Sequence, residues 1–143
     1  MRSVRQLLEA KTPEIFSIGP EAAVIDAIRL MAEKRIGAVL VVEDGRLVGI
    51  LSERDYARKV VLQGRSSVDT PVRAIMTADL VTVGPGDTAD HCMQDVTERR
   101  IRHLPVLKGD ELVGLVSIGD LVKAVIEDQQ VEIEQLQGYI VGR

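Results

Sequence analysis

The sequence predicts an α/β fold of the α+β type, with two β-α-β-β-α repeats packed with pseudo-twofold symmetry. The prediction rests on an internal repeat, the order of apolar and amphipathic segments, and an aliphatic composition with few aromatic residues. Residues 15–61 align with residues 80–126 without a gap, and twelve of the 47 aligned positions are identical. A repeated unit usually cannot bury its apolar face alone, so the two copies are expected to pack together.

Length and composition narrow the class of protein. The chain has 143 residues, of which 45% are hydrophobic, 28% charged and 2% aromatic, and its net charge is −4. The low aromatic content and negative charge disfavour a nucleic-acid surface. The single cysteine, Cys92, excludes an intrachain disulfide, and no apolar run is long enough to cross a bilayer. The N-terminus lacks the apolar core of a signal peptide. We therefore expect a cytoplasmic protein that binds neither nucleic acid nor membrane.

Local patterns predict the elements of the first repeat. They are a helix at 3–10, a strand at 15–18, a helix at 22–35, strands at 38–42 and 46–51, and a helix from Ser52 to about Leu62. The helix at 22–35 rests on an apolar stripe of Val24, Ala27, Ile28, Met31 and Ala32. Asp44 and Gly45 are typical of a hairpin turn, and Gly37 is suited to cap the preceding helix.

The same order returns in the second half. Its predicted elements are a helical turn at 72–76, a strand at 80–83, a helix at 88–100, strands at 103–107 and 111–116, and a helix from Ile118. Gly138 is expected to stop this last helix and leave a frayed tail at 139–143. The predicted organisation is an N-terminal helix and lead-in (1–12), a first repeat (13–62), a linker (63–75), a second repeat (76–127) and a C-terminal extension (128–143).

One motif, G-x-x-S-x-x-D, occurs in each repeat where an apolar strand gives way to a helix. Its copies are Gly49, Ser52 and Asp55, and Gly114, Ser117 and Asp120. A serine with an acid three residues later is also a capping box, which is the commoner meaning of one isolated copy. A ligand site needs the same geometry: the helix N-terminus attracts phosphate, the aspartate can accept ribose hydroxyls, and the glycine lets a ligand approach the strand.

Two such motifs in register resemble the cystathionine-β-synthase (CBS) domain pair, also called the Bateman module. The resemblance covers about residues 12–127 and includes the Gly-Pro turn before the long helix of each repeat. Pro105, within Arg102-His103-Leu104-Pro105-Val106, matches a proline typical of the family. The first repeat departs from this pattern with Leu40, but its segment still has the pattern of a strand, so little loss is expected.

The resemblance implies a regulatory, signal-sensing module that binds adenine nucleotides in clefts between the repeats, with AMP, ADP, ATP or NAD as ligand. It implies no catalytic domain and no catalytic cofactor. Carried over by position, one cleft would contain Ser52, Asp55, Thr77, Val81, Ile101, Arg102 and His103. The other would contain Ser117, Asp120, Thr12, Phe16, Ile36, Gly37 and Ala38. Because family modules commonly pair, we expect a homodimer formed through apolar helix faces.

Basic residues cluster unevenly around the two motifs. Arg54, Arg58 and Lys59 follow the first motif, and Arg99, Arg100 and Arg102 precede the second central strand. Such charges are usually a solvated face. However, the counterparts of Arg54 and Arg102 are Gly119 and Gly37, and only Lys123 follows the second motif. If Arg54 and Arg102 share a cleft, as the resemblance implies, they are suited to a phosphate tail.

Other functional classes find little support in the sequence. His91, Cys92 and His103 lack the spacing of a metal site, and we expect none. No phosphate-binding loop, dinucleotide fingerprint or nucleophile elbow is present, so catalysis is not supported. The main alternative is a protein-interaction adaptor with empty clefts and an unidentified protein partner. An enzyme that acts on a nucleotide is a more distant one.

Overall fold

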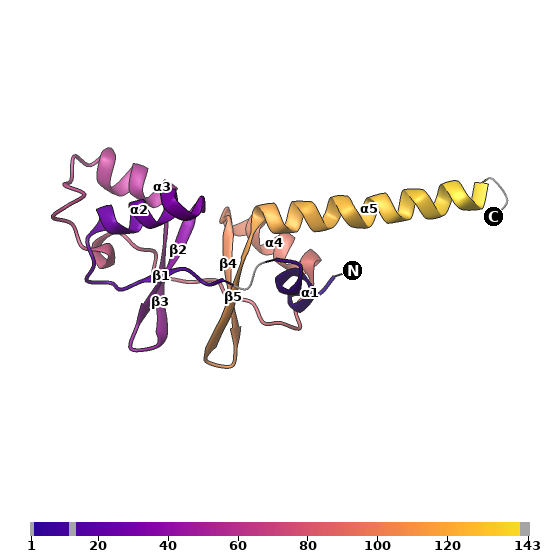
Figure 1. The fold of residues 1–143 in the computed structure, drawn as a ribbon, viewed down its shortest axis with the longest axis horizontal. Helices are drawn as coiled ribbons and strands as arrows, with labels where there is room; N and C mark the ends of the chain where they lie inside the picture. The colour runs from indigo at the N-terminus through magenta and orange to yellow at the C-terminus, as the bar shows by residue number, and fades with distance from the viewer. Residues whose placement is uncertain (1, 12–13, 141–143) are drawn as a thin grey trace. The chain divides into compact units, whose positions relative to one another are not determined.

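A computed structural model describes residues 2–11 and 14–140 (Figure 1). They form two compact units that interleave along the chain. The Asp55 unit comprises residues 14–81 and 110–112, and the Asp120 unit comprises the described residues of 1–13, 82–109 and 113–143. Each unit therefore takes the segment that leads into one repeat together with the body of the other repeat. No helix of the described residues is long and apolar enough to cross a membrane.

The Asp55 unit is built on a three-stranded sheet. Its elements are β1 (Ser17–Ile18), α2 (Val24–Lys34), β2 (Ala38–Glu43), β3 (Arg46–Ser52), α3 (Glu53–Tyr56), the π-helix η1 (Ala57–Val61) and the 3₁₀ helix η2 (Val72–Ala74). The strand order is β1-β2-β3, with β1 parallel and β3 antiparallel to β2. The hairpin turn is confirmed, because Asp44 and Gly45 both have positive φ, at 52° and 76°.

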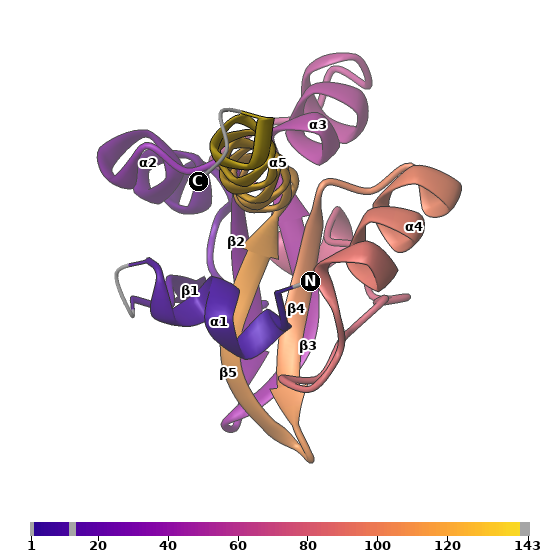
Figure 2. The same cartoon turned by 90° about the vertical axis from the view of Figure 1, so that its right-hand side faces the viewer.

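The Asp120 unit has a two-stranded sheet covered by helices. Its elements are α1 (Val4–Glu9), α4 (Ala89–Arg99), β4 (His103–Lys108), β5 (Glu111–Ser117) and α5 (Ile118–Ile140). The strand order is β4-β5. Within this unit α1 and α4 pack beside the first turns of α5, as Figures 1 and 2 show. Ser3 caps α1 through a capping box with Gln6.

A proline explains why the second sheet lacks a third strand. The strand predicted at 80–83 is reduced to one parallel bridge between Val83 and Val106. In the Asp55 unit, Leu40 N–H donates to Phe16 C=O at 3.2 Å, which helps to hold β1 against β2. Pro105 stands at the position of Leu40 and has no N–H to donate. The segment with Leu40 forms a strand as predicted. The missing N–H of Pro105 accounts for the absence of a third strand from the second sheet.

Each unit buries an aliphatic core, as the composition predicted. In the Asp55 unit the core is formed by Val24, Ala27, Met31, Val39, Val41, Leu51, Val60, Val72 and Ile75. The last two come from the segment predicted as a linker. In the Asp120 unit the buried residues include Leu7, Cys92, Val96, Leu104, Val116 and Leu121. Ala32, predicted to join the apolar stripe of α2, is exposed, because it lies just past the buried face of the helix.

Two predicted helix stops are wrong. Gly37 does not cap α2; the chain instead turns at Arg35, which has φ of 55°, and Arg100 repeats this after α4 with φ of 54°. Gly138 does not end α5, which continues to Ile140. An interior glycine costs a helix only about 1 kcal/mol relative to alanine, and that is too little to end it. The tail residues 141–143 lie outside the described residues.

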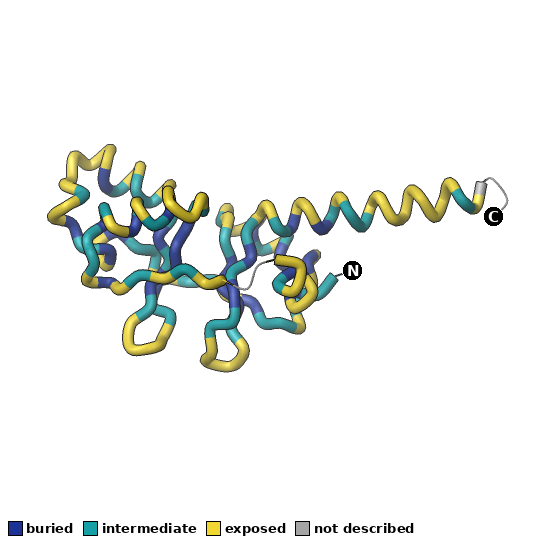
Figure 3. The backbone as a smooth tube through the Cα atoms, viewed as in Figure 1, coloured by how far each residue is buried: buried dark blue, intermediate teal, exposed yellow. Residues whose placement is uncertain are grey.

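The helix predicted from Ser52 to Leu62 is present, but its second turn is widened. α3 makes one α-helical turn, and η1 continues it as a π-helix. Leu62 N–H donates to Ala57 C=O at 3.0 Å, which is the five-residue spacing of a π-turn. By contrast α5 is a regular 23-residue helix, and from Gln129 onward most of it is exposed (Figure 3).

Candidate ligand-binding motifs

The first motif forms the capping box that its spacing allows. Ser52 ends β3, and its Oγ accepts a hydrogen bond from Asp55 N–H at 3.1 Å. In return, Asp55 Oδ2 accepts from the N–H and the Oγ of Ser52, both at 3.0 Å. The motif therefore starts the helix, and the aspartate is held in one orientation at the end of the strand.

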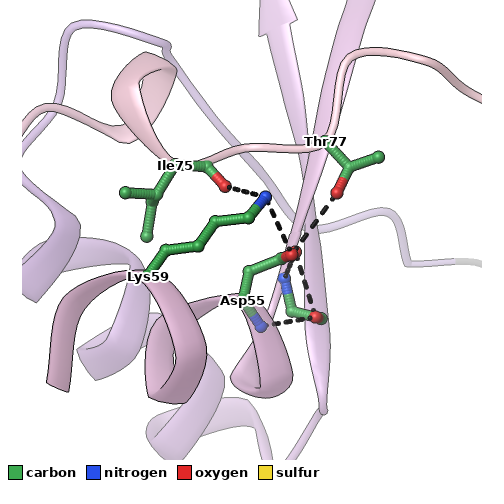
Figure 4. A network of polar contacts seen from close by, with 5 residues as sticks. Asp55, Lys59, Ile75 and Thr77 are labelled. Carbon is green, nitrogen blue, oxygen red and sulfur yellow. Dashed lines mark hydrogen bonds and ion pairs between the residues drawn. The ribbon is translucent and has the colours of Figure 1, made fainter. Parts of the chain in front are cut away.

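The other carboxylate oxygen of Asp55 faces two further groups (Figure 4). Thr77 Oγ1 lies 3.4 Å from Asp55 Oδ1, and Lys59 Nζ lies 3.3 Å from the same atom. Thr77 is brought there because its backbone pairs with Ile50 of β3 in both directions. Lys59 Nζ also donates to Ile75 C=O at 3.0 Å. Asp55 Oδ1 thus has two long, replaceable contacts, whereas Oδ2 is fixed in the capping box.

The second motif repeats the capping box with a different cation. Ser117 N–H donates to Asp120 Oδ2 at 2.9 Å, and Asp120 N–H donates to Ser117 Oγ at 3.1 Å. Lys11 Nζ lies 2.7 Å from Asp120 Oδ2 and donates to Leu115 C=O at 3.0 Å. Burial alone would raise the pKa of Asp120, but the hydrogen bonds from Lys11 and Ser117 outweigh it and lower that pKa below its ordinary value.

The residues before each central strand lie beside the motif of their own unit. Ile118 N–H donates to Arg102 C=O at 2.8 Å, and Glu53 N–H donates to Gly37 C=O at 3.0 Å. His103 is half-buried, and the burial lowers its pKa, with Arg102 and Lys11 acting in the same direction and Asp120 against them. His103 therefore shares the electrostatic environment of Asp120.

The two motif glycines serve the packing of the chain itself. A Cβ built at Gly49 would lie 2.6 Å from Met76 Sδ, and one at Gly114 would lie 2.7 Å from a Leu8 methyl carbon. These distances are far below contact distance, so each glycine admits the segment that leads into a repeat. The interpretation that the glycines leave space for a ligand is corrected, because that space is filled by protein.

The predicted site residues divide between the units. Those of the Asp55 unit are Phe16, Ile36, Gly37, Ala38, Ser52, Arg54, Asp55, Thr77 and Val81. Those of the Asp120 unit are Ile101, Arg102, His103, Ser117 and Asp120. The structure thus brings Thr77 to the first motif as predicted. Assignments that pair residues of different units stay predictions, and Thr12 lies outside the described residues.

Sequence reasoning overlooked the lysine on each motif aspartate. The contact of Lys59 follows from a local pattern, because its four-residue spacing from Asp55 is that of a helical ion pair. Lys11 was not considered, and it is 109 residues from Asp120, so no local pattern could pair them. Phe16 has an unpredicted partner too: Lys34 Nζ lies 5.4 Å from its ring centroid. Among the described residues, no three His, Cys, Asp or Glu side chains gather as metal ligands.

The two strand-to-helix motifs belong to repeats that match a known protein family. A family model described as the CBS domain matches residues 4–62 and 72–127. The chain belongs to the CBS-domain family. The resemblance drawn from the sequence and the predicted fold class are therefore confirmed, and the chain carries two CBS repeats.

Two curated relatives illustrate the range of CBS proteins that the chain matches. The mitochondrial CBS domain-containing protein CBSX3 of Arabidopsis thaliana is 45% identical over 124 residues, which cover 83% of this chain and 60% of the relative. The CBS domain-containing protein YhcV of Bacillus subtilis is 35% identical over 121 residues, which cover 85% of this chain and 84% of the relative. The chain thus spans about 60% of the length of CBSX3 and most of YhcV.

Solved CBS structures agree with the fold. A CBS-domain protein of Burkholderia ambifaria MC40-6, named as a candidate signal-transduction protein, has 55% identity and a TM-score of 0.87, over 90% of this chain and 96% of that one. A CBS domain pair solved with 5′-methylthioadenosine and S-adenosyl-L-methionine has a TM-score of 0.79, over 90% of this chain and 98% of that one. Its identity of 22% supports the shared fold alone.

Proposed function

We propose that the chain is a regulatory module that binds an adenine nucleotide, with AMP, ADP, ATP or NAD as the candidate ligands. The observation that carries the proposal is the pair of motif aspartates. Each is fixed by a capping box at the end of a strand, and each is paired with a replaceable ammonium group. Ribose presents hydroxyl donors that suit such a carboxylate, and phosphate suits the lysine and the start of the helix.

The regulatory role follows from how a ligand would act on these contacts. A nucleotide that takes the carboxylate would displace Lys59 from Asp55, or Lys11 from Asp120. Both lysines also hold backbone carbonyls, of Ile75 and Leu115, in the segments around the motifs. Ligand binding would therefore stabilise a different set of contacts and shift the population of conformations or association states. No catalytic step is required.

Thermal unfolding of the full chain with millimolar adenosine, AMP, ATP or NAD tests the proposal. A ligand at 100 times its dissociation constant adds about 2.7 kcal/mol if it binds only the folded state. In a protein of this size that amounts to several degrees in Tm. The absence of a shift with every one of these ligands would contradict nucleotide binding, and mass spectrometry of co-purified small molecules gives an independent check.

The predicted phosphate contacts have their own test. Arg54 and Arg102 are both exposed. Arg54 aligns with Gly119 of the second repeat, and Arg102 aligns with Gly37 of the first. We expect Arg102→Ala to weaken ATP binding more than adenosine binding, because the change removes a phosphate partner and leaves the sugar contacts intact. Equal losses for ATP and adenosine in calorimetry would mean that the arginine has a structural role.

An adaptor role is the second candidate, and the exposed face of α5 favours it. Among its described residues, seven large apolar side chains are exposed along α5: Ile118 at 39%, Val122 at 43%, Ile126 at 60%, Val131 at 50%, Ile133 at 47%, Leu136 at 62% and Tyr139 at 81%. Exposed apolar residues in such a run mark an association surface, either for a protein partner or for a homodimer. Sedimentation of the chain at tens of micromolar distinguishes these: a monomer would contradict the homodimer.

A further inference from the structure

A pocket of the Asp55 unit has the lining of an anion site. It has a volume of about 390 Å³ and is lined by Lys59, Gln63, Arg65 and Ala74. Two of these residues are cations and a third offers an amide, while none carries a carboxylate. Guanidinium and ammonium donors on one open pocket suit a phosphate group better than an apolar or cationic ligand.

The backbone explains how these side chains come together. After the π-turn of η1 the chain turns back, since Arg65 N–H donates to Val60 C=O at 3.0 Å and Gly64 adopts a left-handed φ of 65°. This turn returns Arg65 to the end of the helix that carries Lys59. Lys59 Nζ in turn donates to Ile75 C=O at 3.0 Å, next to Ala74. The pocket is therefore formed between the end of η1, the turn after it and η2.

The local charge favours an anion although the chain is acidic overall. Residues 57–65 contain Arg58, Lys59 and Arg65 and no acidic residue, whereas the net charge of the chain is −4. The second repeat differs at every matching position. Where the pocket has Lys59, Gln63 and Arg65, that repeat has Ala124, Asp128 and Gln130. The positive pocket is thus a property of one repeat.

We propose that this pocket binds a polyphosphate group, held by Arg65 and Gln63 together with Lys59. The link to the motif is Lys59, whose Nζ lies 3.3 Å from Asp55 Oδ1. When the lysine turns to phosphate, Asp55 Oδ1 becomes available to the ribose hydroxyls of the same nucleotide. This inference rests on the proposed function and deepens it: the phosphate tail of a nucleotide at Asp55 would lie in this pocket rather than at Arg54 and Arg102, and the second repeat lacks the matching basic residues.

Isothermal calorimetry of the full chain with ATP, adenosine and inorganic tripolyphosphate tests the pocket. Arg65→Ala should weaken ATP and tripolyphosphate about tenfold and leave adenosine unchanged, because one charge-assisted contact to phosphate is lost. Arg65 is exposed, so the substitution leaves the core intact. Arg46→Ala, at the start of β3 beside the hairpin turn, removes the same charge in the same unit and should change none of the three affinities.

The outcomes separate this inference from the proposed function. If Arg65→Ala binds ATP as tightly as the parent chain while adenosine binding still depends on Asp55, the pocket is refuted and the nucleotide site stands. If tripolyphosphate binds in an Arg65-dependent manner and adenosine does not bind, the pocket holds free polyphosphate and the nucleotide proposal fails. If neither ATP nor tripolyphosphate depends on Arg65, the pocket is not an anion site.

Discussion

The two CBS repeats place their motif aspartates in the same way but neutralise them differently. Asp55 is approached by Lys59 from the next helical turn, and Asp120 is approached by Lys11 from the N-terminal segment. The position matching Lys59 is Ala124, and the position matching Lys11 is Met76. Each repeat thus lacks the lysine that the other uses.

This difference shows which part of the motif is fixed by the backbone and which part by charge. The capping box forms in both repeats, because it needs only the serine and the aspartate at a helix start. A partly buried carboxylate also favours a nearby cation, which stabilises its charged form. Any residue whose ammonium reaches the carboxylate meets that requirement, so the lysine can come from different parts of the chain.

The largest loss of folding stability is expected where the repeats differ in backbone hydrogen bonding. Leu40→Pro gives the first repeat the proline of the second and removes the N–H that donates to Phe16 C=O. Leu40 is fully buried, so the orphaned carbonyl and the lost side-chain volume should together cost about 3 kcal/mol. Urea denaturation measures it. Leu40→Met retains the N–H and should cost less than about 1.5 kcal/mol; equal losses in both variants would show that the hydrogen bond to β1 is unimportant.

The next effect concerns ligand affinity at each motif. Asp55→Ala and Asp120→Ala should each weaken adenosine binding at one site by about tenfold or more, because a hydrogen bond to a charged group contributes roughly 1.5–3 kcal/mol. Calorimetry measures both affinities. Asp69→Ala is the control, since Asp69 forms two similar local contacts with the Ser66 hydroxyl, at 3.1 and 3.2 Å, in a turn outside the CBS motifs. A loss as large in Asp69→Ala would mean that losing a local serine–aspartate contact, and not ligand contact, accounts for the effect.

A smaller effect is expected from removing one counter-ion. Lys11→Met gives position 11 the residue found at the aligned position, Met76, and so removes the ammonium group beside Asp120. Because the contact with Lys11 lowers the pKa of Asp120, it stabilises the fold above about pH 4, and this contribution disappears as pH falls through the lowered pKa. The variant should lose about 0.5–1 kcal/mol at pH 7, since the pair is partly exposed, and match the parent chain near pH 2.

Urea denaturation at pH 7 and in acid checks that prediction, with Lys123→Met as the control. Lys123 is an exposed lysine of α5 in the same unit, so its replacement changes net charge equally. An equal loss of stability in both variants would assign the effect to net charge. A difference between Lys11→Met and the parent chain that persists in acid would assign it to packing.

The sequence predicts those features of this fold that depend on neighbours along the chain. The repeat, the strand-to-helix position of Ser52 and Asp55, and the Asp44-Gly45 turn all follow from local spacing. The two-stranded second sheet depends on one absent N–H, that of Pro105, which could have been inferred by comparing the repeats. The π-turn of η1 follows no residue pattern that we recognise in 57–61.

The candidate sites are harder to predict because they depend on contacts between distant segments. Lys11 reaches Asp120, and Leu8 fills the space over Gly114, only because the N-terminal segment packs with the second repeat. Arg65 joins Lys59 only because the chain reverses at Gly64. Family resemblance pointed to the serine and aspartate of each motif, whereas the residues that set the charge around them required the structure.

The smallest effect on the free energy of unfolding is expected at another position where the repeats differ: His103 of the second repeat aligns with Ala38 of the first. Burial, followed by Arg102 and Lys11, lowers the pKa of His103, and Asp120 only partly opposes this. The unfolded chain therefore binds the proton more readily, so stability should fall as pH drops from about 6.5. His103→Ala removes this contribution, which should amount to less than about 1 kcal/mol between pH 7 and 6.

The measurement is the slope of the unfolding free energy against pH. Packing lost with the side chain lowers stability equally at each pH, so it leaves this slope unchanged. His91→Ala, which replaces the other histidine, should keep the slope of His103. If the His103→Ala variant has the same slope as the parent chain, His103 is not the group that makes stability fall as pH drops.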